Sequence, residues 1–307
     1  MKINEIESKV GKKMNEEKGF QKTNINWYPG HMVKAINEIK KNLKYIDLVL
    51  VVLDARIPFA SLNKDIYEIV KQKTVIMLFN KADLADPVKL KKAEDKYKQE
   101  GCYTVRTNAL SGEGIKETIE LIKNLGSKIK YKNKTSTSYK IVKNVYRVLV
   151  VGVPNCGKSS ILNKIANKKS AEVGNKPGVT KQKQWIRVDK QIEIMDTPGI
   201  LAPKLLGEQT GEKLALCGNI KEEILDLQEL SIDLIEMLKS APLYLSMLKD
   251  RYKIEEDIEK MTNVEILELV GKKRGAIIKG GEIDYEKTAR ILIEDYRSGK
   301  IGRISLE

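Results

Sequence analysis

The segment Gly152–Ser159 constrains the fold of this 307-residue chain more than any other feature. It reads G-V-P-N-C-G-K-S, a complete match to the phosphate-binding loop pattern G-x-x-x-x-G-K-[ST]. An apolar run over 148–151 precedes it, and a helical pattern over 160–167 follows it. Glycines let backbone N–H groups approach phosphate oxygens, and the positive N-terminal end of a helix favours the same anions. The pattern therefore predicts a strand, a loop and a helix that hold a nucleoside phosphate.

This segment supplies most of the predicted nucleotide contacts. We expect Lys158 to reach the β- and γ-phosphates and the Ser159 hydroxyl to bind Mg²⁺. The predicted nucleotide-binding residues of the segment are Asn155, Cys156, Gly157, Lys158, Ser159 and Ser160.

The tetrapeptide D-T-P-G at 196–199 follows a later predicted strand. We expect the Asp196 carboxylate to hold Mg²⁺ through a water molecule, and the Gly199 N–H to sense the γ-phosphate. The alternative interpretation is an ordinary turn, because Thr-Pro-Gly is favourable turn chemistry. Thr180 lies in the polar segment between this motif and the phosphate-binding loop, and we predict it as a ligand of Mg²⁺ and the γ-phosphate.

A third motif, N-K-A-D at 80–83, indicates which base the nucleotide carries. The Asp83 carboxylate would accept two hydrogen bonds from guanine, one from the ring N–H and one from the exocyclic amine. Adenine lacks this donor pair, so GTP is favoured and ATP is the alternative nucleotide. Asn80 would brace the loop, and Lys81 would lie over the base.

The tetrapeptide N-A-L-S at 108–111 follows the next predicted strand and resembles the S-A-x element of GTPases. The Ala109 N–H would then point at the guanine oxygen, with Asn108 in the place of the commoner serine. In ordinary Ras-like GTPases the phosphate-binding loop comes before the N-K-x-D motif. Here that order is reversed, as in a circularly permuted GTPase.

Apolar runs and helical patterns alternate between residue 26 and about residue 200. This alternation predicts an α/β fold with a doubly wound sheet, whose ligands lie at the carboxyl ends of its strands. The predicted strands span residues 48–53, 74–79, 103–107, 148–151, 184–188 and 191–195. The predicted helices span residues 32–43, 62–71, 87–100, 115–125 and 160–167.

Past about residue 205 the strand signals stop, and the remaining patterns are helical, over 220–239, 264–270 and 285–296. We therefore predict an N-terminal extension (1–25), a circularly permuted GTPase domain (26–204) and a small all-helical domain (205–307). The basic segment 127–147 contains no acidic residue and interrupts the first domain. It is either a linker or a strip that contacts phosphates.

The charge of the chain bears on its partners. A formal net charge of +14 favours a polyanion, either nucleic acid or an anionic membrane, although general lysine richness explains it equally simply. The cluster Lys272–Arg274 favours RNA, yet such clusters are usually just solvated. Three cysteines without C-x-x-C spacing fit a reducing cytosol, and no apolar run reaches the roughly 18 residues that span a bilayer. We expect a cytoplasmic protein without membrane attachment.

Taken together, the motifs and their order resemble the circularly permuted GTPases of the ribosome biogenesis GTPase A family. The segments W-Y-P-G-H-M at 27–32 and D-A-R-I-P at 54–58 are similar to that family, as is P-G-V-T at 177–180. The resemblance covers about residues 26–300. It implies a GTPase that acts late in assembly of the large ribosomal subunit, with a C-terminal helical domain that contacts ribosomal RNA.

One catalytic position is left open by the motifs. Ras-like enzymes carry a glutamine near D-x-x-G that orients the attacking water, whereas Ile200 follows Gly199 here and Gln209 is distant. The resemblance implies His31, the only histidine of the chain, as the catalytic candidate. The alternative is a structural residue at a helix start. For Asn155, similarity to related GTPases implies a possible K⁺ site, with K⁺ as activator.

Two other functions compete with a ribosome-associated GTPase. One is a G-protein switch that regulates proteins or membranes without an RNA partner, although the chain has neither a Met-Gly start nor a C-terminal CaaX motif. The other is a GTP-sensing module with negligible turnover, favoured if His31 is only structural.

Overall fold

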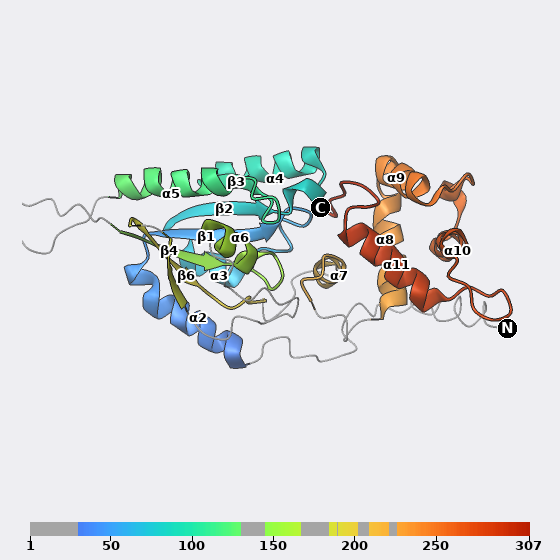
Figure 1. Ribbon diagram of the computed structural model, residues 1–307, viewed down its shortest axis with the longest axis horizontal. Helices are drawn as coiled ribbons and strands as arrows, with labels where there is room; N and C mark the ends of the chain where they lie inside the picture. Colours follow the sequence, from blue (N-terminus) through green and yellow to red (C-terminus); the bar gives the residue numbers. More distant parts are fainter. Residues whose placement is uncertain (1–29, 130–144, 167–183, 189, 202–208, 221–225) are drawn as a thin grey trace, which may run out of the picture.

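The computed structural model of the chain describes residues 30–129, 145–166, 184–188, 190–201, 209–220 and 226–307 (Figure 1). The predicted extension 1–25, Thr180 and most of the basic segment 127–147 lie outside these residues.

A six-stranded sheet forms the core of the N-terminal part, in the order β3-β2-β1-β4-β6-β5. Its strands are β1 (Leu48–Asp54), β2 (Thr74–Asn80), β3 (Tyr103–Thr107), β4 (Tyr146–Val151), β5 (Gln184–Arg187) and β6 (Ile192–Asp196). Neighbouring strands are parallel except at the edge, where β5 runs antiparallel to β6. The predicted doubly wound α/β sheet is confirmed, with strand bounds that agree to within two residues.

Helices pack on both faces of this sheet. Figure 1 shows α4 (Pro87–Gln99) and α5 (Ile115–Lys128) along one side and α2 (Gly30–Asn42) along the other. The shorter helices α3 (Lys64–Val70) and α6 (Lys158–Ile165) complete the N-terminal part. Every residue of β1 is buried, because a central parallel strand covered by helices exposes neither face to water. This is why its sequence is a continuous apolar run.

The C-terminal part is helical, as predicted. It contains α7 (Thr210–Leu216), α8 (Leu227–Lys239), α9 (Pro242–Tyr252), α10 (Asn263–Arg274) and α11 (Tyr285–Arg297), and α8 packs against α9, α10 and α11. The sequence patterns did not predict α7 or α9. Both are short, and α9 is recognisable mainly by Pro242 at its first turn, a position that suits proline because its missing N–H would be unpaired there anyway.

After α11 the chain returns to the sheet. The Ile304 N–H donates to the Leu84 carbonyl at 3.0 Å, and the Leu306 N–H donates to the Arg56 carbonyl at 3.0 Å. Figure 1 shows the chain end, marked C, at the junction between the sheet and the helical part. Residues at the end of the sequence therefore lie against the loops that follow β1 and β2.

Candidate nucleotide-binding site

The loops that carry the motifs meet at one edge of the sheet. In the strand register, Asp54 lies beside Asn80, and Asn80 lies beside Thr107. The loops after β1, β2 and β3 therefore begin side by side. The phosphate-binding loop follows β4, on the other side of β1, and Asp196 ends the next strand, β6.

The Asn80 side chain joins three motifs that are far apart in the sequence. Its Nδ2 donates to the Cys156 carbonyl at 2.8 Å, inside the phosphate-binding loop. Its Oδ1 accepts from the Ala109 N–H at 3.0 Å and from the Thr107 hydroxyl at 3.3 Å. Asn80 is buried, so these bonds replace its contacts with water. One amide thereby holds the N-K-x-D, S-A-like and phosphate-binding elements together.

Gly157 is required by this contact. Its φ of +100° lies in the left-handed region, and a Cβ added to it would lie 2.0 Å from Asn80 Nδ2. The second glycine of the phosphate-loop pattern therefore serves two purposes. It allows the turn into α6, and it leaves room for the brace from the N-K-x-D loop.

Lys158 begins α6, and its side chain is buried. Its ammonium donates to the Val153 carbonyl at 2.8 Å, so it points back across the phosphate-binding loop. Ser159 and Ser160 follow in the first turn of the helix, where backbone N–H groups lack intrahelical partners. Burial raises the pKa of the Cys156 thiol, which favours its neutral form within the loop.

The D-T-P-G motif packs directly on the phosphate-binding loop. Asp196 is buried at the end of β6, and the Thr197 hydroxyl donates to the Val150 carbonyl at 2.7 Å. A Cβ added to Gly199 would lie 2.7 Å from the Pro154 Cα and 3.1 Å from Lys158 Nζ. Only a glycine therefore lets this backbone approach the lysine so closely.

A reciprocal pair of bonds connects the phosphate-binding loop to the helical part. The Asn155 amide donates to the Gly218 carbonyl at 2.8 Å, and the Asn219 amide donates to the Pro154 carbonyl at 2.8 Å. Asn219 is buried. Sequence reasoning did not identify Asn219, because a single asparagine before a predicted helix carries no motif signal.

Asp54 and Arg56 form a buried ion pair beside the loop that carries the N-K-x-D motif (residues 80–83, here called the base loop). The guanidinium of Arg56 donates from Nε to Asp54 Oδ1 at 2.9 Å and from NH2 to Oδ2 at 2.8 Å, and Lys81 Nζ lies 2.8 Å from the same Oδ2. Arg56 also donates to the carbonyls of Cys217 at 3.2 Å and Arg297 at 3.4 Å. The Cys217 carbonyl directly follows α7, and the Arg297 carbonyl belongs to the last residue of α11. Helix dipoles favour a cation at both positions.

The two cations determine the ionisation of Asp54. Burial alone would raise the pKa of this carboxyl, but the charges of Arg56 and Lys81 and their hydrogen bonds hold the pKa well below its usual range. For Arg56, burial works to lower the pKa, and the carboxylate of Asp54 raises it well above its ordinary value. Both groups are therefore charged at neutral pH.

The remaining predicted residues occupy different surroundings. Asp83 lies exposed in the 3₁₀ turn η2 (Ala82–Leu84), after Lys81 in a left-handed conformation with φ of 59°. The Asn108 carboxamide oxygen accepts from the N–H groups of Leu110 at 2.8 Å and Ser111 at 3.2 Å, and so caps its own loop. His31 is the second residue of α2.

Comparison with characterised proteins identifies relatives of the chain. It is 40% identical over 287 residues to the ribosome biogenesis GTPase A of Bacillus licheniformis, across 92% of this chain and 98% of that protein. The ribosome biogenesis GTPase A of Thermotoga maritima is 33% identical over 283 residues, across 92% and 94% of the two chains. The chain belongs to the ribosome biogenesis GTPase A family. It is therefore a GTPase involved in ribosome biogenesis.

Two further similarities agree with this family. A family model described as a 50S ribosome-binding GTPase matches residues 147–274. The crystal structure of GNP-bound YlqF from T. maritima resembles the fold with a TM-score of 0.60 at 29% identity, across 89% of this chain and 97% of that one. Both support the nucleotide-binding sheet followed by a helical part.

GTPases generally use Mg²⁺, and the residues at its expected position fit this ion. Ser159 lies in the first turn of α6 after β4, and Asp196 ends β6, the neighbouring strand. Hydroxyl and carboxylate oxygens are hard ligands of the kind that Mg²⁺ takes together with phosphate oxygens and water. When bound, the ion neutralises charge on the phosphates. Within the described part of the chain, no helix has the length and apolar character needed to cross a membrane.

Proposed function

We propose that this GTPase acts in late assembly of the large ribosomal subunit, and that its nucleotide state controls how the helical domain binds ribosomal RNA. The observation that carries the proposal is the reciprocal pair of bonds between Pro154–Asn155 and Gly218–Asn219. Residues 154 and 155 belong to the loop that would surround the phosphates. A change in that loop on hydrolysis would therefore reach the turn between α7 and α8 directly.

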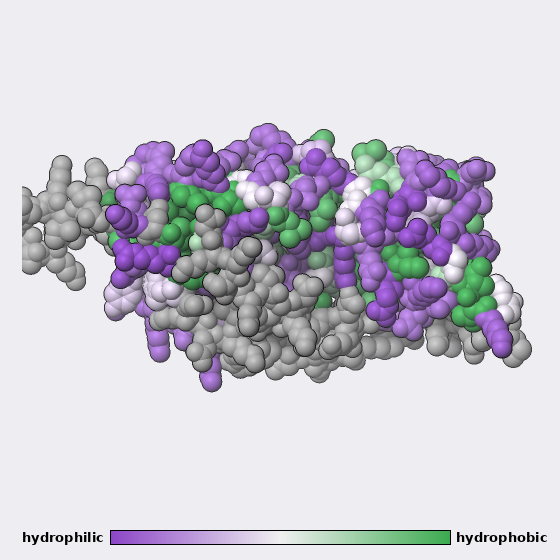
Figure 2. Space-filling model, viewed as in Figure 1, coloured by the Kyte–Doolittle hydropathy of each residue, from purple (hydrophilic) through white to green (hydrophobic). Residues whose placement is uncertain are grey.

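The helical domain offers a basic surface for RNA. Lys272, Lys273 and Arg274 are exposed in the last turn of α10, and Lys279 is exposed beyond it. In the view of Figure 2, hydrophilic residues cover most of the visible side of the helical part, with smaller apolar patches. Cations at a helix C-terminus also stabilise the helix itself, so the cluster alone does not define a partner. Together with a net charge of +14, it supports a polyanionic one.

The site residues take specific roles in this proposal. Asp83 and Lys81 contact guanine, while Lys158 and Gly199 contact the phosphates. The Ala109 N–H, expected at the guanine oxygen, donates to Asn80 Oδ1 in the structure instead. His31 positions the attacking water, and Thr180 and K⁺ at Asn155 complete the site around the γ-phosphate. We place the division between the GTPase and helical domains at residues 204–205, which lie outside the described residues, and we place the protein in the cytoplasm.

Co-sedimentation with large-subunit precursor particles tests the proposal. We expect tighter binding with a non-hydrolysable GTP analogue than with GDP, and a steep loss of binding as salt rises, because lysines and arginines release counterions from RNA phosphates. The combined substitution of Lys272, Lys273 and Arg274 by glutamine should weaken binding and reduce the salt slope by about 0.7–0.9 for each phosphate that the variant no longer neutralises.

The matched control replaces Lys91, Lys92 and Lys98, which are exposed on α4, with glutamine. It removes the same charge from a different face and should leave binding close to that of the wild type. Equal binding in the GTP-like and GDP states would contradict nucleotide control. An equal decrease of binding in the two triple variants would remove α10 as the RNA-contacting element.

A further inference from the structure

The turn that carries Asp83 is supported from outside by the segment after α11. The Arg303 guanidinium donates from Nε to the Ala85 carbonyl at 2.9 Å and from NH2 to the Ala82 carbonyl at 3.0 Å. The adjacent Ile304 N–H donates to the Leu84 carbonyl at 3.0 Å. Three carbonyls that surround Asp83 therefore accept bonds from residues about 220 positions away in the sequence.

Such support matters because the turn has little of its own. It is a three-residue 3₁₀ helix, a form with poor internal hydrogen-bond geometry. Of its two backbone bonds, the one from the Leu84 N–H to the Lys81 carbonyl is 3.0 Å, and the closing bond from the Ala85 N–H to the Ala82 carbonyl is long at 3.4 Å. It follows Lys81, whose left-handed conformation is unfavourable for a residue with a Cβ. The fork of Arg303 bridges the first carbonyl of the turn and the carbonyl just beyond it.

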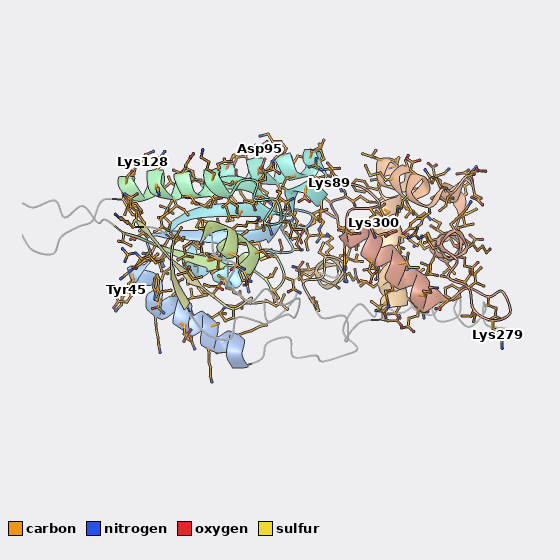
Figure 3. The ribbon with its side chains drawn as sticks, viewed as in Figure 1. Tyr45, Lys89, Asp95, Lys128, Lys279 and Lys300 are labelled. Carbon is orange, nitrogen blue, oxygen red and sulfur yellow. The ribbon has the colours of Figure 1, made fainter. Side chains whose placement is uncertain are left out.

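The segment around Arg303 is itself anchored. The Ser305 hydroxyl accepts from the Asp86 N–H at 3.0 Å, and the Ser305 carbonyl accepts from Lys89 Nζ at 3.0 Å. The Tyr244 hydroxyl, from α9, donates to Asp86 Oδ2 at 2.7 Å. Figure 3 shows Lys89 and Lys300 on the two sides of this junction. The residues after Arg303 are therefore fixed to the chain that directly follows the turn.

We propose that Arg303 is a positioning residue for guanine recognition, which sets the Asp83 carboxylate in the geometry that both guanine donors require. The inference rests on the proposed contact between Asp83 and guanine. It assigns the base selectivity of the N-K-x-D loop in part to a residue of the C-terminal part. A recognition group must be held within about 0.5 Å of its productive position. A planar guanidinium that bridges the Ala82 and Ala85 carbonyls restrains the turn in this way.

The test compares GDP with inosine diphosphate, which lacks only the exocyclic amine. Both nucleotides make the same phosphate and ribose contacts, so the ratio of their dissociation constants reports the second hydrogen bond to Asp83. A bond to a charged group corresponds to a preference of about 10–100-fold for GDP in the wild type. We expect Arg303→Ala to lower that ratio by about fivefold or more, because a bond that depends on a well-placed carboxylate weakens as the turn relaxes.

Two further variants separate positioning from general stability. Arg251→Ala removes an arginine that pairs with the buried Asp295 at 2.9 Å within the helical part. It should destabilise the protein and leave the ratio unchanged. Arg303→Lys keeps the charge but loses the planar fork, so the ratio should fall as it does in Arg303→Ala. The lysine variant also serves if the alanine variant fails to fold.

The outcomes distinguish the contact with guanine from the support that Arg303 gives it. If the wild type binds both diphosphates equally, or if Asp83→Asn does not change the ratio, the guanine contact itself is wrong. If the wild type discriminates through Asp83 while Arg303→Ala or Arg303→Lys keeps the full ratio, Arg303 is not a positioning residue. An equal fall in Arg251→Ala would show that the change reflects destabilisation alone.

Discussion

The ammonium of Lys81 lies 2.8 Å from Oδ2 of Asp54, so the lysine of the N-K-x-D motif is paired with a buried carboxylate at the end of the adjacent strand. The same carboxylate holds Arg56, which in turn reaches the ends of two helices in the C-terminal part. The base loop and the helical part therefore share one buried charge cluster. Any change at Asp54 should affect both.

We expect Asp54→Asn to destabilise the protein by about 3–5 kcal/mol at neutral pH, because it leaves the buried Arg56 without a counter-charge. Urea unfolding monitored by circular dichroism measures this difference. The matched control is Asp95→Asn, which breaks a solvent-screened pair with Lys91 on α4 and should change stability far less.

The same pair predicts a pH dependence. The pKa of Asp54 is lower in the folded state than in the unfolded chain, where it is about 3.9. The stabilisation is therefore fully present above pH 4 and is lost as the pH falls toward the folded-state pKa. The stability gap between wild type and Asp54→Asn should be constant from pH 7 to 5 and shrink below pH 4. A gap that widens in acid would contradict this assignment.

Asp83→Asn should change the preferred base of the bound nucleotide from guanine to xanthine. The substitution replaces an acceptor with a group that also donates, and xanthine carries a carbonyl where guanine has its amine. Competition binding with GDP, xanthosine diphosphate and ADP measures the change. Wild-type protein that binds ADP as tightly as GDP would refute guanine specificity altogether.

Lys158→Ala and Ser159→Ala should each impair nucleotide binding or hydrolysis, through loss of a phosphate contact and of a Mg²⁺ ligand respectively. Lys164→Ala is a suitable control, since it lies on α6 beyond the phosphate-binding loop. Isothermal titration with GDP and steady-state GTP hydrolysis provide the readouts. Full activity in both loop variants would mean that the assignment of the phosphate-binding loop is wrong.

Gly157→Ala should disconnect the phosphate-binding loop from the base loop. A left-handed alanine costs about 1–2 kcal/mol, and its Cβ would displace the Asn80 amide from the Cys156 carbonyl. The strain lowers stability in the free and bound protein alike, whereas the lost bond of about 0.5–1.5 kcal/mol disorders the loop that holds the nucleotide, so we expect GDP affinity to fall by up to about tenfold. Gly275→Ala is the control, because Gly275 is also left-handed, with no atom within 4 Å of an added Cβ. Equal GDP affinity in both variants would contradict the role of the Asn80 brace.

His31→Ala should slow hydrolysis without weakening nucleotide binding, because a residue that positions water acts on neither the base nor the phosphates. Positioning of this kind contributes about 10²–10⁴-fold, so a decrease of about tenfold or more is expected. Single-turnover hydrolysis should be measured with ribosomal particles, first in K⁺ and then in Na⁺. An unchanged rate would make His31 structural, and equal rates in the two salts would argue against a K⁺ site at Asn155.

Local patterns were sufficient to predict the sheet and the motif loops. A central parallel strand has to be apolar throughout, so 48–53 was recognisable, and a phosphate-binding loop has to follow a strand and precede a helix. The order of the motifs along the chain was visible in the same way. The helices α7 and α9 were missed because runs of consecutive apolar residues weaken the helical periodicity of their sequences: Leu214, Ala215 and Leu216 in α7, and Leu243, Tyr244 and Leu245 in α9.

Tertiary structure alone decided how the motifs are connected. Asn80 was expected to brace its own loop, but not to reach Cys156. This bond, those from Asn155 to Gly218 and from Asn219 to Pro154, and the bonds from Arg303 join residues separated by 63 to 221 positions. Each depends on which carbonyl the folded chain leaves within reach of an amide or guanidinium, and no spacing rule encodes that. The sequence by itself determined a GTPase sheet followed by a helical part. Only the packing of that part against the loops at the sheet edge showed that residues of both parts contact the candidate site.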